Sequence, residues 1–428
     1  MKLKKIYIAL GLAALLSACK SEEPVNPMDK EGEVPMSFVL SLSSNMSGTR
    51  SIDPIQPDID ETDDESKKGT EFDNKIENLK AFIYSVNASN ELDQRIAEMT
   101  VYDNNIIHQK DAAGNVLQEK YVISGKMKTL GNKTVKDLET GTYRLVIFAN
   151  INDNDLNKFG DASNHLSKLG TAYFTCHGIP YGNDAFNSIP MYGVGDASFK
   201  DISKKDIGET YTIQNGSGNG DLTVNMLRAM AKVRVKWNKN NKDLADRGMK
   251  LKSIQLSRHS EKGYFVPKLW KKSSNIGELS KKYWSNVFTQ QTYTSGCPAV
   301  NATDKIPEDA NNSDMIRFYV PDTYNIDSDD AETEQVHDHD KEIELKVVYE
   351  IDGEERDNTI LFRRYGSDGK PVEGEDAWDI IRNHIYEFVI NGVEASTGEL
   401  IINVGVKDWG SKEVEVIEYD TPIPSASK

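Results

Sequence analysis

Few residues in this chain have the types and spacing that catalysis or metal binding requires. His337 and His339 are two positions apart, so in an extended segment both imidazoles would share a face and could bind a divalent metal. That segment follows a strongly acidic stretch and lacks a spaced third ligand. Asp153 begins a sequence like a calcium loop, but Lys158 stands at its glycine position. We therefore predict no metal site.

The cysteines and histidines also fail to form a nucleophilic pair. Cys176 and His177 are adjacent, and neighbours on a strand point to opposite faces. Cys176 is expected to be a buried thiol or a disulfide partner of Cys297, which export would permit. The two cysteines fall in different predicted domains, which argues against the disulfide. Because no hydrolase, metalloprotease, Walker or dinucleotide fingerprint occurs, we predict no catalytic residue, no cofactor and no enzyme.

Cys19 is the residue at which covalent modification is predicted. Lysines precede an apolar run, Ile6 to Leu16, that is too short to span a bilayer as a mature helix. Leu16-Ser17-Ala18-Cys19 resembles a bacterial lipobox, so we predict a signal peptide at 1–18, cleavage before Cys19 and acylation, as with palmitate. The lipid would anchor the chain without spanning the membrane. An ordinary signal peptide with an incidental cysteine is the alternative.

Arg50 is the only basic residue between Lys30 and Lys67. It stands in a run of serine, asparagine and glycine, SLSSNMSGTRS, that a protease could bind in an extended form. A solvated loop arginine is the alternative interpretation of the same residues.

The segment that precedes Arg50 is itself predicted to be a strand. In VPMSFVLSLSS, residues 34–44, apolar residues alternate with serines, which predicts a strand with one buried face. The apolar positions are Met36, Phe38, Leu40 and Leu42. A polar tether, 20–33, precedes this strand, and an acidic linker, 53–65, follows it.

The rest of the chain predicts an all-β protein. From Ile76 onward, short runs rich in Val, Ile, Tyr and Phe recur, with turn signals such as DAAGN and DGEE between them. Only residues 153–169 show a pattern that suits short helices. So many strands exceed one sandwich, and the Gly- and Asn-rich QNGSGNGD, 214–221, marks a boundary. We predict a signal peptide at 1–18, a lipidated propeptide with the first strand at 19–50, and β-sandwiches at 51–224 and 225–428.

Charge excludes several classes of partner. The formal net charge is −17 and the chain has three cysteines. Phosphate backbones and anionic lipid heads should repel it, so no nucleic-acid partner is expected. Three cysteines are too few for a disulfide framework. No second apolar run approaches transmembrane length, so the membrane is reached only through the lipid on Cys19.

Several stretches of the sequence together carry a family resemblance. They are LETGTYRLVIFAN (138–150), LRAMAKVRVKW (227–237), GYFVP (263–267), FYVPD (318–322), IIRNHIYEFVINGV (380–393) and LIINVGVKDW (400–409). In this order they resemble the fimbrillins of Bacteroidales type V pili, the major and minor fimbrium subunits. RNHIYEFVINGV is the most specific stretch and is most similar to the C-terminal domain of minor fimbrium subunits, while VPD, 320–322, departs from the acidic-Asn ending of the pattern.

The resemblance implies both a fold and an assembly route. It implies two tandem transthyretin-like sandwiches and export as a lipoprotein to the outer membrane and cell surface; Lys20 to Glu23 resembles a surface-export signal. An arginine-specific protease would then cut Arg50–Ser51 and release the strand that holds Met36 to Leu42. A strand from another copy, or from a homologous pilus subunit, would refill the groove in an extracellular fimbrium.

The C-terminal residues hold the predicted donor strand, 413–419. Val414 and Val416 alternate with glutamates, and Ile417 and Tyr419 continue the pattern with a change of face. The same residues would otherwise close their own sandwich.

Two other functions remain open. The chain could be the tip adhesin or the anchor of the same pilus, with the receptor for adhesion left undetermined. It could instead be a monomeric surface lipoprotein that binds glycans, with Trp270, Trp284 and Tyr293 as a stacking platform.

Overall fold

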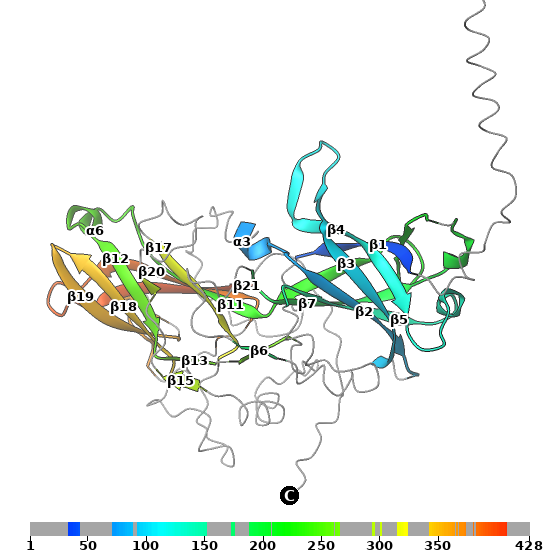
Figure 1. Ribbon diagram of the computed structural model, residues 1–428. Helices are drawn as coiled ribbons and strands as arrows, with labels where there is room; N and C mark the ends of the chain where they lie inside the picture. Colours follow the sequence, from blue (N-terminus) through cyan, green and yellow to red (C-terminus); the bar gives the residue numbers. More distant parts are fainter. Residues whose placement is uncertain are drawn as a thin grey trace, which may run out of the picture.

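The structure of this chain, a computed structural model, is built almost entirely from β-strands (Figure 1), which confirms the predicted all-β class. Among the described residues the helical elements are short: α3 (Glu71–Asn74), η2 (Val135–Leu138), η4 (Ile202–Lys204) and α6 (Lys242–Asp246). The predicted helices at 153–169 lie outside the described residues, which are 33–42, 71–88, 92–151, 173–175, 188–206, 208–260, 262–265, 293–295, 300–301, 315–323, 342–363, 365–366, 368–373, 380 and 382–408.

The first half of the chain forms one nine-stranded sheet that closes on itself. The path runs β10-β1-β4-β3-β2-β5-β7, and β10 also pairs with β7, so seven strands form a hydrogen-bonded circuit. The short β8 and β9 pair with β1 and β7. The strands are β1 (Val34–Ser41), β2 (Leu79–Val86), β3 (Leu92–Lys110), β4 (Val116–Thr129), β5 (Tyr143–Ala149), β7 (Met191–Ser198), β8 (Tyr211–Thr212), β9 (Gln214–Asn215) and β10 (Thr223–Arg228).

The strands of this half, predicted to form a β-sandwich, are linked in one continuous hydrogen-bonded circuit. Strands β1 and β10 join the β4 side of the circuit to the β7 side. Every residue of β5 is buried, as expected for a strand covered on both faces. The transthyretin-like layout named by the resemblance stays a prediction.

The second half forms two four-stranded sheets that share one core. The sheets have the orders β17-β11-β20-β21 and β16-β12-β18-β19, and their buried side chains form a second apolar cluster. The strands are β11 (Met230–Trp237), β12 (Lys250–Leu256), β16 (Val300–Asn301), β17 (Met315–Pro321), β18 (Glu344–Ile351), β19 (Glu354–Leu361), β20 (His384–Val393) and β21 (Leu400–Asp408).

Two small sheets complete the described structure. The short β13 (Arg258–Ser260) pairs with β15 (Tyr293–Ser295), and β14 (Lys262–Tyr264) pairs with β6 (Tyr173–Thr175). The β6–β14 pair joins the first half of the chain to the second.

The turn signals occur where the sequence places them. In DGEE, Asp352 and Gly353 both have positive φ, 54° and 79°, and connect β18 to β19 as a two-residue hairpin loop. In DAAGN, the Asp111 carboxylate accepts hydrogen bonds from the backbone N–H of Ala113 and Asn115 at 2.9 and 2.8 Å. Both predicted turns are therefore confirmed.

The chain passes from the first apolar cluster to the second between two adjacent residues of β11. Met230 packs in the first apolar cluster and Ala231 in the second. The predicted boundary after residue 224 falls inside β10, which belongs to the first sheet. The two clusters meet at this junction, because Phe265, Tyr319 and Ile385 from the second half pack in the first cluster.

Candidate functional site: the groove of strand β1

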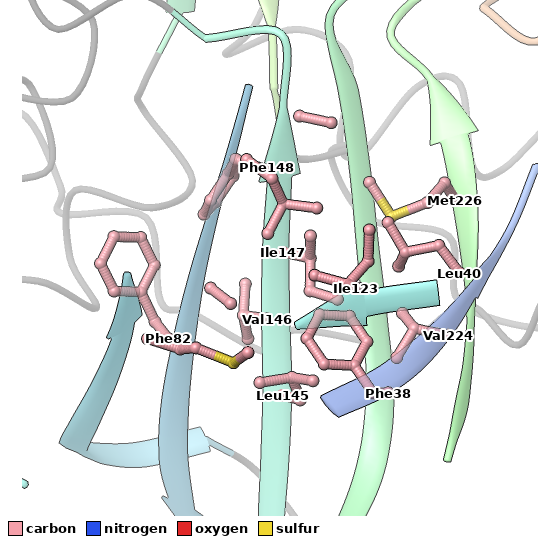
Figure 2. Close-up of a cluster of buried hydrophobic side chains, with 14 of the residues drawn as sticks. Phe38, Leu40, Phe82, Ile123, Leu145, Val146, Ile147, Phe148, Val224 and Met226 are labelled. Atoms are coloured by element: carbon pink, nitrogen blue, oxygen red, sulfur yellow. The ribbon is translucent and has the colours of Figure 1, made fainter. Parts of the chain in front are cut away.

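Strand β1 carries the predicted row of apolar side chains into the first core. Met36, Phe38, Leu40 and Leu42 are 0, 1, 0 and 3% exposed. Figure 2 shows Phe38 and Leu40 among Ile123 of β4 and Val224 and Met226 of β10. The buried face of β1 is therefore the face that the alternation in the sequence predicts. Leu42 lies just past the end of the strand.

Both edges of β1 are paired. On one side it runs antiparallel to β4 along its whole length, from Val34 opposite Met127 to Ser41 opposite Lys120. On the other side it runs parallel to β8 and β10. A strand with two neighbours is central to its sheet and cannot be reached by simple edge addition.

Backbone hydrogen bonds fix β1 in this groove. The Val39 N–H donates to the Leu222 carbonyl at 3.0 Å, and the Ser37 carbonyl accepts from the Ile213 N–H at 2.8 Å. The Leu42 N–H donates to the Glu119 carbonyl at 2.8 Å. An occupant of this groove must therefore offer an extended backbone as well as apolar side chains.

Removal of β1 would open the circuit without dividing it. The remaining strands stay joined along the path β4-β3-β2-β5-β7-β10. The loss would expose the sites of four buried side chains, each worth about 1.5–3 kcal/mol. It would also leave two unpaired strand edges facing each other, so the empty groove would need another strand.

The residues that carry the resemblance meet at the junction of the two cores. Asp322 of FYVPD binds Arg382 of IIRNHIYEF through its side chain at 2.5 and 2.7 Å, and Arg382 also donates to the carbonyl of Phe265 in GYFVP at 3.1 Å. Asn383 donates through its N–H to the Met230 carbonyl in LRAMAKVRVKW at 2.8 Å. These motifs are therefore joined by structural contacts.

A buried polar cluster on α3 adjoins the groove. The Asp73 carboxylate binds the Lys232 ammonium of β11 at 2.8 Å and accepts a hydrogen bond from the Tyr319 hydroxyl of β17. Arg228, the last residue of β10, donates to the Asp73 carbonyl at 3.0 Å and to the Asn74 side chain at 2.5 Å. The side chains of Asp73 and Lys232 are 0 and 1% exposed.

The cluster stabilises Asp73 in its charged form. Burial by itself would raise the pKa of Asp73, but the charges of Lys232 and Arg317 and the hydrogen bonds from Lys232 and Tyr319 hold it at about 2. Burial lowers the pKa of the Lys232 ammonium to about 8, although attraction to Asp73 opposes this shift. Because its carboxylate accepts two hydrogen bonds and faces two cations, Asp73 is the anion around which the cluster forms.

Sequence reasoning missed this cluster. Lys232 alternates with buried valines in β11, which is a signal for a buried cation. Its partner lies 159 residues earlier in the chain, so no local pattern identifies it.

The remaining predicted site residues lie outside the described part of the chain. They are Cys19, Arg50, Ser51, Cys176, Cys297, Trp270, Trp284, His337, His339, Val414, Val416, Ile417 and Tyr419. Tyr293 is in β15.

The described residues hold no group of three or more His, Cys, Asp or Glu side chains arranged for a metal ion, and no helix among them is long and apolar enough to cross a membrane. The absence of a metal site stays a prediction, as do the two alternatives for Cys176, a buried thiol or a disulfide with Cys297.

Comparison with known proteins returns matches only among solved structures. No protein-family model matches the chain, and no curated protein matches it. One similar structure is the tip fimbrial protein Mfa3 from Porphyromonas gingivalis with a C-terminal truncation, at 13% identity and a TM-score of 0.44, covering 88% of this chain and 100% of that chain. Another is a fimbrial assembly protein from Parabacteroides distasonis, at 13% identity and a TM-score of 0.41, covering 88% and 96%.

Both structures belong to fimbrial proteins, the class that the sequence resemblance names. At these identities and TM-scores the similarity carries no argument about function. The groove and the sequence motifs carry it instead.

Proposed function

We propose that this protein is a structural subunit of a surface pilus that supports adhesion and polymerises by donor-strand exchange. The precursor is exported as a lipoprotein through Cys19, and an arginine-specific protease cuts the Arg50–Ser51 bond. Strand β1 then leaves with the lipid, and a strand of another subunit enters the groove. The protein has no enzymatic role.

One observation carries this proposal: β1 is central and buried, and the other six strands of the circuit stay connected without it. It pairs with β4 and with β8 and β10, yet the other strands of the circuit remain joined without it. It is also the first described strand, so a single cut in residues 43–70 would leave it bound only by non-covalent contacts. Those two features are what a replaceable strand requires.

The cleavage is tested on cells that express Arg50→Ala. We expect a folded surface lipoprotein that does not assemble, because β1 stays linked to the chain and fills its groove. The N-terminus of protein sheared from wild-type cells should be Ser51, by Edman sequencing. Lys67→Ala, which changes the next basic residue, is the control and should assemble normally. Fimbriae of normal length on Arg50→Ala cells would exclude the proposed cut.

The donor is tested by deletion of residues 413–428. We expect a folded, cleavable monomer, and Val416→Asp should do nearly the same because a carboxylate in an apolar pocket costs several kcal/mol. Pro424→Ala, past the strand pattern, is the control. Assembly is followed by size-exclusion chromatography and electron microscopy. Wild-type polymers from the truncated chain would place the donor elsewhere.

A further inference from the structure

Both strands that border β1 are hydrogen-bonded to Asn74 of α3, and β10 is also bonded to the adjacent Asp73. On one side Tyr121 of β4, which lies opposite Leu40, donates through its hydroxyl to the Asn74 carbonyl at 2.6 Å. On the other side Arg228, at the end of β10, donates to the Asn74 Oδ1 at 2.5 Å and to the Asp73 carbonyl at 3.0 Å. Asp73 and Asn74 therefore connect the two walls of the groove.

This connection does not depend on β1. The hydrogen bonds that hold Asp73 and Asn74 come from side chains of β4, β10, β11 and β17. Lys232 of β11 and Tyr319 of β17, both from the second half of the chain, bind the Asp73 carboxylate. The cluster also lies on the part of the chain that follows Arg50, so a cut at that residue leaves it with the body of the protein.

An empty groove can be closed by direct pairing of the two strands that border it. Strand β4 is antiparallel to β1 and β10 is parallel to β1, so β4 and β10 are antiparallel to each other. With β1 gone, these two edges can pair directly and close a circuit of six strands. Such pairing satisfies their backbone groups and leaves no space for an incoming strand.

We propose that Asp73 and Asn74 form a clamp that keeps β4 and β10 one strand apart while the groove is empty. Tyr121 and Arg228 are then positioning residues for the incoming strand. The inference rests on the proposed function, since it assigns a role that matters only after β1 has left. We therefore expect loss of the clamp to change the hydrogen exchange and assembly of the cut protein far more than it changes the uncut protein.

The test uses the full chain with Cys19→Ser, before and after cleavage by an arginine-specific protease. Tyr121→Phe removes the hydroxyl that donates to Asn74, and Asn74→Ala removes the acceptor of Arg228. Tyr143→Phe is the matched control, because its hydroxyl donates to the Asp137 carbonyl at 3.0 Å from β5, which does not border β1. Hydrogen–deuterium exchange follows β4 and β10, and light scattering follows assembly.

We expect the uncut variants to match the uncut wild type in exchange and in melting temperature to within a few degrees. After cleavage, Tyr121→Phe and Asn74→Ala should assemble about tenfold more slowly, because each has lost a buried hydrogen bond that selects the open groove. Tyr143→Phe should assemble at the wild-type rate. Equal effects on the cut and uncut forms, or wild-type assembly of both variants, would overturn the clamp. Failure of the cut wild-type protein to assemble would instead count against the proposed function.

Discussion

The two halves of the molecule differ in whether their sheets have free edges. The strands of the first half, the first group, form a closed circuit, and those of the second half, the second group, form open sheets. In the first, β10 closes the circuit, and each of its seven strands has another strand of the circuit on both sides. In the second, among the residues that the structure describes, β17, β21, β16 and β19 are the edge strands of two open sheets. A closed circuit can accept a new strand only by losing one of its own, whereas an open sheet accepts a strand by addition.

The edges of the second group carry features that oppose addition. Strand β19 presents four charged residues in a row, Glu354 to Asp357, and charge on an edge discourages pairing. At β21, the Ile402 N–H donates to the Gly369 carbonyl at 3.3 Å, so a turn covers part of that edge. These features support the proposal that a strand enters by exchange at the groove of β1 and not by addition to the second group.

Substitution of Phe38 is expected to destabilise the first group of strands most strongly. Phe38→Ala should lower the free energy of unfolding by about 3–5 kcal/mol, because the ring is fully buried between β4 and β10. Differential scanning calorimetry should show a lower transition temperature for the first core and an unchanged transition temperature for the second core. Val39→Ala, on the half-buried opposite face, is the control and should cost less than about 1 kcal/mol. A joint shift of both transitions would show that the cores are not separable.

Acid should weaken the junction between the two groups. The pKa of Asp73 is about 2 in the folded protein and 3.8 ordinarily, so its contribution is complete above 3.8 and is lost as the pH falls toward 2. Between pH 5 and 2.5, the stability advantage of wild type over Asp73→Asn should shrink by about 2 kcal/mol, measured by urea unfolding. Asp206→Asn, at an exposed site, is the control variant and is measured over the same pH range. A constant difference for Asp73→Asn would mean that its carboxylate is not stabilised there.

Closure of the circuit is tested at Gly193 of β7. A Cβ at this position would lie 2.4 Å from the Met226 sulfur and 2.7 Å from the Asn225 carbonyl oxygen of β10. Gly193→Ala should therefore separate β7 from β10 and cost about 1–3 kcal/mol. Hydrogen–deuterium exchange should rise in β10 and leave β18 and β19 unchanged. Ser198→Ala on the same strand is the control, and equal exchange in both variants would contradict the close contact.

The smallest effect is expected in the hairpin of the second group. Gly353 has a φ of 79° and open space around its Cβ position, so Gly353→Ala should cost about 1 kcal/mol from backbone strain alone. Thermal unfolding would measure this cost. Assembly should be unaffected, since the hairpin does not touch β1. A change in assembly rate would mean that the second group takes part in strand entry.

Much of the fold was predictable because its signals are local. The alternation around Phe38 depends only on the two-residue period of a strand, and the β18–β19 turn depends only on the preference of Asp-Gly for positive φ. The closed circuit was not predictable, because the parallel pairing of β1 with β10 joins Leu40 to Val224 across most of the first half of the chain. Nothing near either residue identifies the other.

The sequence by itself determined which residues are apolar, which strand precedes Arg50, and where the turns fall, since these follow from side-chain type and backbone preference over a few positions. Only the tertiary structure decided that β1 is central and not an edge, and that Asp73 meets Lys232 and Tyr319. Those contacts depend on the packing of two cores against each other. A buried ion pair forms where desolvation can be offset by a partner, and that partner is supplied by the fold.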